Sequence, residues 1–175
     1  MPAWPRIRGK REKLEAKVRI QRPKAEIFEF YRDLTNLPLF LGDVMSVEPT
    51  GSDTWRWVIQ GPARVKIRWD IKVVEENPNT LIRYETTTLG GLDTVWNVYF
   101  DDGDTPGSTD VREVMEIPLG RIGKAGLALM GKPPAEEMAA NLRRLKQLME
   151  TGHVTETSHA VPGKFTTPAP EQHRE

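Results

Sequence analysis

The chain has 175 residues, enough for one domain with a sizeable core, and its 25 Lys and Arg balance its 25 Asp and Glu. It contains no cysteine, which excludes disulfide bonds and a thiolate nucleophile. Its histidines, His153, His159 and His173, all follow the last predicted helix, so we expect no His-based catalytic or metal site in the core.

The N-terminal region is basic and contains the first predicted strand. Lys and Arg outnumber Glu among the first 22 residues, and from residue 15 to 21 the apolar Ala16, Val18 and Ile20 alternate with polar residues. We therefore expect residues 1–14 to form a flexible basic arm. Such an arm predicts at most a weak contact with an anionic membrane, and no specific nucleic acid partner.

Two short helices and six further strands are predicted next. Pro23 favours the start of the first helix, and the second, around residues 34–41, is interrupted by Pro38. The longest regular alternation, residues 65–73, predicts a central, strongly curved strand. Runs of alternating residues, bounded by Gly, Pro, Asn or Asp, predict strands over residues 44–49, 54–60, 65–73, 81–87, 93–100 and 109–117.

A long amphipathic helix is predicted near the C-terminus. It begins at Pro133-Pro134, after a shorter helical segment over residues 121–130, and it ends at Gly152. Thr, Pro, Gly and charged residues follow, so residues 152–175 are expected to form a disordered polar tail. The apolar stripe of the long helix consists of Met138, Leu142, Leu145 and Met149.

Short motifs occur along residues 15–151 in a recognisable order. They are Val18-x-Ile20-x-x-Pro23, Ile27-Phe28, Asp33-Leu34, Asn36-x-Pro38, Trp57-x-Ile59-x-Gly61-Pro62, Trp69-Asp70, Val98-x-Phe100, Thr109-x-Val111 and Leu142-x-x-Leu145-Lys146. In these motifs the chain resembles the SRPBCC/START-like helix-grip superfamily, most closely its bacterial polyketide cyclase/dehydrase-like branch. The resemblance implies an α+β helix-grip fold, in which a curved antiparallel sheet of about seven strands wraps around a long C-terminal helix over residues 15–151.

The resemblance also implies an internal cavity for an apolar or amphipathic small molecule, and no single reaction. No metal or cofactor is expected. Side chains on the concave face of the sheet and on the apolar stripe of the helix are predicted to line this cavity. They are Trp57, Ile59, Ile67, Trp69, Ile71, Tyr84, Trp96, Val98, Phe100, Val111, Glu113, Met115, Met138, Leu142 and Leu145.

Glu113 is the one carboxylate in this set. If the alternation of the last strand is unbroken, Glu113 shares a face with Val111 and Met115 and points into the cavity. Burial would then raise its pKa and suit it to act as a general acid or base, with Tyr84 as a second catalytic candidate. The alternative is a bulge near Glu113, or a position at the solvent-open mouth beside an Arg.

Three functions fit these observations. The first is a binding protein for a hydrophobic or amphipathic small molecule, such as a lipid, a quinone or a polyketide-like compound. The second is a cyclase or dehydratase that uses Glu113, and the third is an interaction protein that acts through its basic arm. The chain has no apolar run of about 20 residues and no signal-peptide core near its start, so we expect a cytoplasmic protein.

Overall fold

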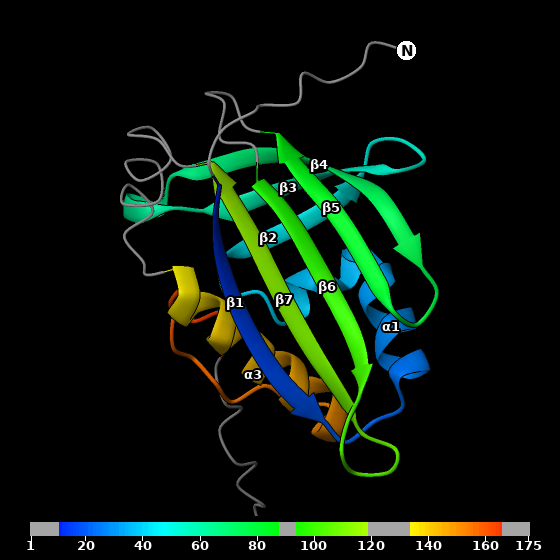
Figure 1. The fold of residues 1–175 in the computed structure, drawn as a ribbon. Helices are drawn as coiled ribbons and strands as arrows, with labels where there is room; N and C mark the ends of the chain where they lie inside the picture. Colours follow the sequence, from blue (N-terminus) through cyan, green and yellow to red (C-terminus); the bar gives the residue numbers. More distant parts are fainter. Residues whose placement is uncertain (1–10, 88–93, 119–133, 166–175) are drawn as a thin grey trace, which may run out of the picture.

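The computed structural model describes residues 11–87, 94–118 and 134–165. Seven antiparallel strands form a single sheet in the order β1-β7-β6-β5-β4-β3-β2, and the helices α1 and α3 pack on the same face of it (Figure 1). This arrangement confirms the predicted α+β helix-grip fold. The helical segment predicted over residues 121–130 lies outside the described residues.

The element boundaries follow the sequence pattern closely. The strands are β1 (Arg11–Ile20), β2 (Val44–Pro49), β3 (Thr54–Gln60), β4 (Lys66–Asn77), β5 (Leu81–Thr87), β6 (Thr94–Asp102) and β7 (Thr109–Pro118). The helices are α1 (Lys24–Arg32) and α3 (Pro134–Thr151), with 3-10 turns η1 (Leu34–Leu39) and η2 (Pro62–Arg64). The predicted helix around residues 34–41 is thus a 3-10 helix with Pro38 inside it.

The core lies between the sheet and its two helices. From α3, Met138, Leu142 and Leu145 are buried, as the apolar stripe predicts, and Met149 is partly buried. From α1, Phe28 packs edge-on against Phe100 of β6, with ring centroids 5.4 Å apart. The two helices therefore cover different parts of the same sheet face.

β1 begins earlier than predicted. It pairs with β7 from Arg11 opposite Pro118 to Ile20 opposite Thr109, so residues 11–14 belong to the sheet and not to a flexible arm. The physical reason is that β7 offers backbone partners along its full length, and Leu14 lies opposite Met115 on the core face. Residues 1–10, the rest of the predicted arm, lie outside the described residues.

β4 is an interior strand, but β5 occupies the middle of the sheet. The register of β4 against β5 shifts between Val73 and Glu75, which marks a bulge in β4. Of its predicted core residues Ile71 is buried, whereas Ile67 and Trp69 are half-buried. The regular alternation therefore predicts which face of the sheet these side chains occupy, but not how deeply each is buried.

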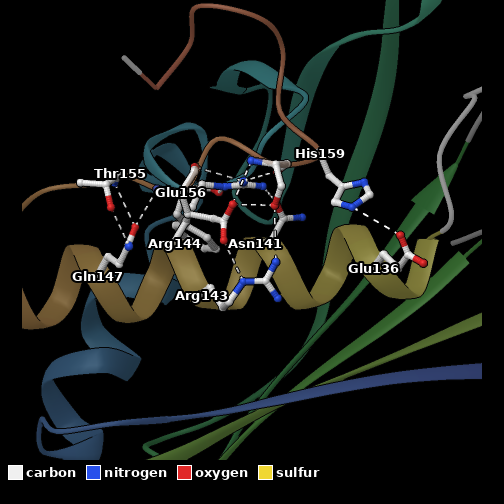
Figure 2. A network of polar contacts seen from close by, with 10 residues as sticks. Glu136, Asn141, Arg143, Arg144, Gln147, Thr155, Glu156 and His159 are labelled. Atoms are coloured by element: carbon white, nitrogen blue, oxygen red, sulfur yellow. Dashed lines mark hydrogen bonds and ion pairs between the residues drawn. The ribbon is translucent and has the colours of Figure 1, made fainter. Parts of the chain in front are cut away.

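The C-terminal residues are more ordered than their composition suggests. Residues 153–165, which we call the C-terminal segment, run back along α3 and bond to it (Figure 2). Gln147 of α3 accepts hydrogen bonds from the main-chain N–H groups of Thr155 and Glu156, both at 3.0 Å. The predicted disordered tail is wrong for this segment, because side chains of α3 satisfy its backbone, and residues 166–175 lie outside the described residues.

Arg144 is the main contact between α3 and the C-terminal segment (Figure 2). Its side chain is fully buried. The guanidinium donates to the carbonyl oxygens of Phe40 and Ser158, each at 2.7 Å, and to the Asn141 side-chain oxygen. One cation thus joins the helix, the C-terminal segment and the end of η1.

Candidate functional site

A cavity of about 80 Å³ lies between the sheet and the first half of α3. Most of its lining side chains are apolar or aromatic. They come from β3 to β7, from α3, and from residues 40–44, which run from the end of η1 to the first residue of β2 and which we call the wall loop. The lining residues are Leu41, Asp43, Val44, Trp57, Ile59, Trp69, Tyr84, Thr94, Trp96, Glu113, Met115, Pro134, Glu137, Met138 and Asn141.

Eight of the fifteen residues predicted for the cavity line it. They are Trp57, Ile59, Trp69, Tyr84, Trp96, Glu113, Met115 and Met138. The other seven lie elsewhere in the described structure: Ile71, Val98, Phe100, Val111, Leu142 and Leu145 are buried in the core, and Ile67 is half-buried. At Phe100 the cause is α1, whose Phe28 and Tyr31 pack against the Phe100 ring and fill that end of the sheet. The cavity is thereby confined to the other end.

Seven lining residues were not predicted. They are Leu41, Asp43, Val44, Thr94, Pro134, Glu137 and Asn141. Asn141 could have been found, because it lies three positions after Met138 and so shares its helix face. The wall loop residues have no periodicity that would place them, and only the fold brings them beside α3.

Glu113 lies on the concave face of β7. It pairs with Ala16 of β1 and Val98 of β6, and neither ladder has a register shift there. Its side chain is 1% exposed. The phenolic hydroxyl of Tyr31, a residue of α1, donates to the Glu113 carboxyl at 2.7 Å. The carboxyl is therefore buried at the cavity and paired with a hydroxyl, not with an Arg.

Burial raises the pKa of Glu113 from 4.5 to about 7, and the hydrogen bond from Tyr31 offsets part of that rise. Burial, followed by the nearby Glu113 charge, also raises the pKa of Tyr31 and of Tyr84 well above 10. Both phenols are consequently neutral near pH 7, while Glu113 exists in both protonation states. The group can donate or accept a proton without leaving the physiological range.

Aromatic rings form one wall of the cavity. The Tyr84 ring stacks on Trp96, with centroids 5.9 Å apart and an interplanar angle of 9°, and it lies 5.9 Å from Trp57 on its other side. Trp96 donates its indole N–H to the Thr94 hydroxyl at 3.0 Å. The Trp57 indole N–H is buried and has no hydrogen-bond partner within the described part of the chain. The site thus combines flat apolar surface with few polar groups.

The described residues contain no group of three His, Cys, Asp or Glu that could hold a metal ion. Within those same ranges, no helix is both long and apolar enough to cross a bilayer.

Replacing Glu113 with Gln should change how stability depends on pH. Because the folded pKa lies above the unfolded one, the stability associated with this group is fully present below about pH 4.5 and is lost as the pH rises to about 7. The loss is on the order of 3 kcal/mol. Gln cannot ionise, so the Glu113→Gln variant avoids this loss. In urea unfolding, its free energy of unfolding should match that of the wild type at low pH and exceed it at pH 8.

The matched control is Glu116→Gln on the opposite face of β7, where the carboxylate pairs with Lys13 at 3.6 Å. It should show no comparable gain at pH 8. An equal gain in stability in both variants would contradict the raised pKa of Glu113 and the burial that causes it.

Comparisons with known proteins agree on the architecture. A family model described as polyketide cyclase / dehydrase and lipid transport matches residues 11–150. A solved structure from Deinococcus radiodurans has 20% identity and a TM-score of 0.63, covering 81% of this chain and 99% of its own. A START superfamily protein from Mycobacterium smegmatis has 14% identity and a TM-score of 0.61, covering 78% and 98%.

A third structure is the di-domain ARO/CYC BexL from the BE-7585A biosynthetic pathway. It has 20% identity and a TM-score of 0.60, covering 80% of this chain and 50% of that one. At these identities the likenesses establish the fold alone. A comparison with curated proteins gave no match.

Proposed function

Because the chain belongs to the polyketide cyclase/dehydrase and lipid transport family, which matches its residues 11–150, we propose that it binds a hydrophobic or amphipathic small molecule in this cavity. Lipids, quinones and polyketide-like compounds are the candidate classes. Among them we favour a compound with a flat ring and at least one oxygen. The observation that carries this proposal is the fully buried carboxyl of Glu113 in a wall that is otherwise mainly aromatic and apolar.

The chemistry of the lining supports a ring with an oxygen. Trp57, Tyr84 and Trp96 present faces and edges on which a planar ring can stack, and each such contact contributes about 0.5–1.5 kcal/mol beyond its buried area. A neutral Glu113 can donate to a ligand oxygen, and the Trp57 N–H would gain a partner if that oxygen reached it. A purely hydrocarbon ligand would leave these groups unused.

The size of the cavity sets a condition on binding. Sites for drug-sized ligands are typically about 300–1,000 Å³, whereas this cavity measures about 80 Å³. A ligand of two or more rings therefore requires a wall to move outward.

The binding function is tested by calorimetric titration with 2-naphthol and with naphthalene, which differ by one hydroxyl. We expect saturable binding of both, tighter for 2-naphthol. Trp96→Leu should weaken binding of both by about tenfold, since it removes a stacking face worth about 1.4 kcal/mol. Glu113→Gln should keep naphthalene binding intact, because it retains the shape and apolar surroundings of the site.

Trp55→Leu is the matched control, since Trp55 is a partly buried tryptophan of the same sheet that does not line the cavity. Binding that weakens equally in Trp55→Leu and Trp96→Leu, or that never saturates, would overturn the proposal.

A cyclase or dehydratase is the second candidate, favoured by the pKa of Glu113 near 7 beside two phenols. In this case the Glu113 carboxylate would remove a proton from a carbon next to a ligand carbonyl, and Tyr84 would orient that carbonyl. Heptane-2,6-dione is a simple probe, because ring closure with loss of one water gives 3-methylcyclohex-2-enone, which absorbs in the ultraviolet. Glu113→Gln should abolish enone formation and leave binding unchanged. Equal rates in both proteins would exclude this candidate.

A further inference from the structure

The C-terminal segment holds one wall of the cavity in place. The Lys164 ammonium donates to the carbonyl oxygens of Leu41 and Val44, and both of these residues line the cavity. Between them, the carbonyl of Gly42 accepts from the main-chain N–H of Val161 at 2.9 Å. The wall loop is thus bonded to the C-terminal segment along most of its length.

The same segment shares its anchor with α3. Arg144 donates both to Phe40 in the wall loop and to Ser158 in the C-terminal segment. The Gly42 N–H donates to the Asn141 side-chain oxygen at 2.9 Å, and Asn141 itself lines the cavity. Any side chain at position 42 would collide with the His159 carbonyl and with Arg144. The segment, the wall loop and α3 therefore form one closely fitted contact.

An outer groove lies directly beyond the cavity. Asp43 and Glu137 line both the cavity and this groove, so they form the partition between the two. The groove is also lined by residues 60–64, from the end of β3 through η2, and by Ala160, Val161 and Pro162 of the C-terminal segment. Moving the segment away would free the wall loop and open the partition from its outer side.

The C-terminal segment is attached mainly by polar contacts, without buried apolar side chains of its own. None of its residues is fully buried. Its side-chain links to α3 include the ion pair of Arg143 with Glu156 at 2.9 Å and the contact of His159 with Glu136 at 3.5 Å (Figure 2). Exposed pairs of this kind contribute about 0–1 kcal/mol each, and segments without buried apolar side chains open at free energies far below that of global unfolding.

We propose that the C-terminal segment is a latch on the cavity. Attached, it holds the wall loop against α3 and keeps the cavity at its small volume; detached, it opens a path from the outer groove past Asp43 and Glu137. The latch rests on the proposed binding function, because it regulates access to that same site. The C-terminal segment follows residue 150, where the family match ends, so the latch lies outside the part of the chain that the family model covers.

Cross-linking tests the latch on the full chain. Since the protein has no cysteine, Arg143→Cys with Ser158→Cys supplies two unique thiols on exposed side chains that contact each other at 3.4 Å. A bismaleimide with an internal disulfide joins them and can be cleaved by reduction. We expect the association rate of 2-naphthol, measured by stopped-flow fluorescence, to fall at least tenfold on cross-linking and to recover when the linker is cleaved.

A loosened latch should have the opposite effect. Lys164→Met removes the donor to Leu41 and Val44, so 2-naphthol should associate several-fold faster and the Gly42 amide should exchange its hydrogen faster. The matched control is Lys146→Met, which removes a similar bond from α3 to the Arg19 carbonyl, at 2.7 Å, away from the wall loop.

The outcomes separate the latch from the binding function. Saturable binding with unchanged association rates in the cross-linked, cleaved and Lys164→Met proteins would overturn the latch and leave the binding function standing. The absence of binding in every form, including Lys164→Met, would overturn both.

Discussion

Arg144→Met should lower the free energy of unfolding by about 2–4 kcal/mol. The methionine fills much of the volume of the Arg side chain but offers no donor. The Phe40 carbonyl therefore loses its charged donor inside the protein, and a buried acceptor left without a donor costs about 1–3 kcal/mol. The Asn141 side-chain oxygen keeps the Gly42 N–H but loses a hydrogen bond from a charged group, which contributes about 1.5–3 kcal/mol. Urea unfolding followed by circular dichroism measures the loss.

The control is Arg143→Met, at the residue directly before Arg144 on α3. The Arg143 side chain is 50% exposed and pairs with Glu156 near the surface, so its replacement should cost less than about 1 kcal/mol. Similar losses in both variants would indicate that the buried contacts of Arg144 contribute no more than a surface pair.

Leu142→Ala should cost about 2–5 kcal/mol, the range for truncating a packed leucine in a core. Leu142 is 1% exposed and does not line the cavity, so its truncation leaves a new void surrounded by apolar side chains. The cost should appear as a lower midpoint of thermal or urea unfolding. Ligand affinity should change little, since the walls of the cavity remain in place.

Met138→Ala is the informative comparison for Leu142→Ala. Met138 is equally buried but lines the cavity, so part of its surface already faces empty space and its truncation enlarges an existing cavity. We expect a smaller loss of stability and a larger change in affinity for 2-naphthol. The reverse order would mean that the cavity lies under Leu142 and not under Met138.

The sheet was predictable because its residues carry a period of two. β5 spans the predicted residues 81–87, and β3 spans residues 54–60, since each has alternating side chains and a turn at either end. β1 was predicted too short, because the pairing of Arg11 with Pro118 depends on the length of a partner strand far away in the sequence. Register with a distant strand leaves no local pattern.

The C-terminal segment shows the same limit in a second form. Its Thr, Pro and Gly are typical of disorder, yet main-chain groups at Thr155, Ser158 and Val161 find partners on α3 and on the wall loop. Those partners belong to elements that the composition of residues 152–175 does not describe. Composition also predicts that this segment adds no buried core residues, and none of its residues 153–165 is fully buried.

The candidate site was predictable in part. The alternation of β7 placed Glu113 on the concave face, but it could not identify Tyr31, which lies 82 positions earlier on α1 and supplies the hydrogen bond to the carboxyl. It also could not place the end of the cavity, because the rings of α1 fill the space in front of Phe100. Faces follow from periodicity, whereas depth and partners follow from tertiary packing.

The tryptophans of the cavity have a practical consequence. Trp57, Trp69 and Trp96 all line the space in which a ligand would sit. Indole emission depends on the polarity and the neighbours of the ring, so occupancy of the site alters the intrinsic fluorescence of the unlabelled protein. Screening of compound collections then needs no attached dye, and the natural sequence already supplies the optical signal.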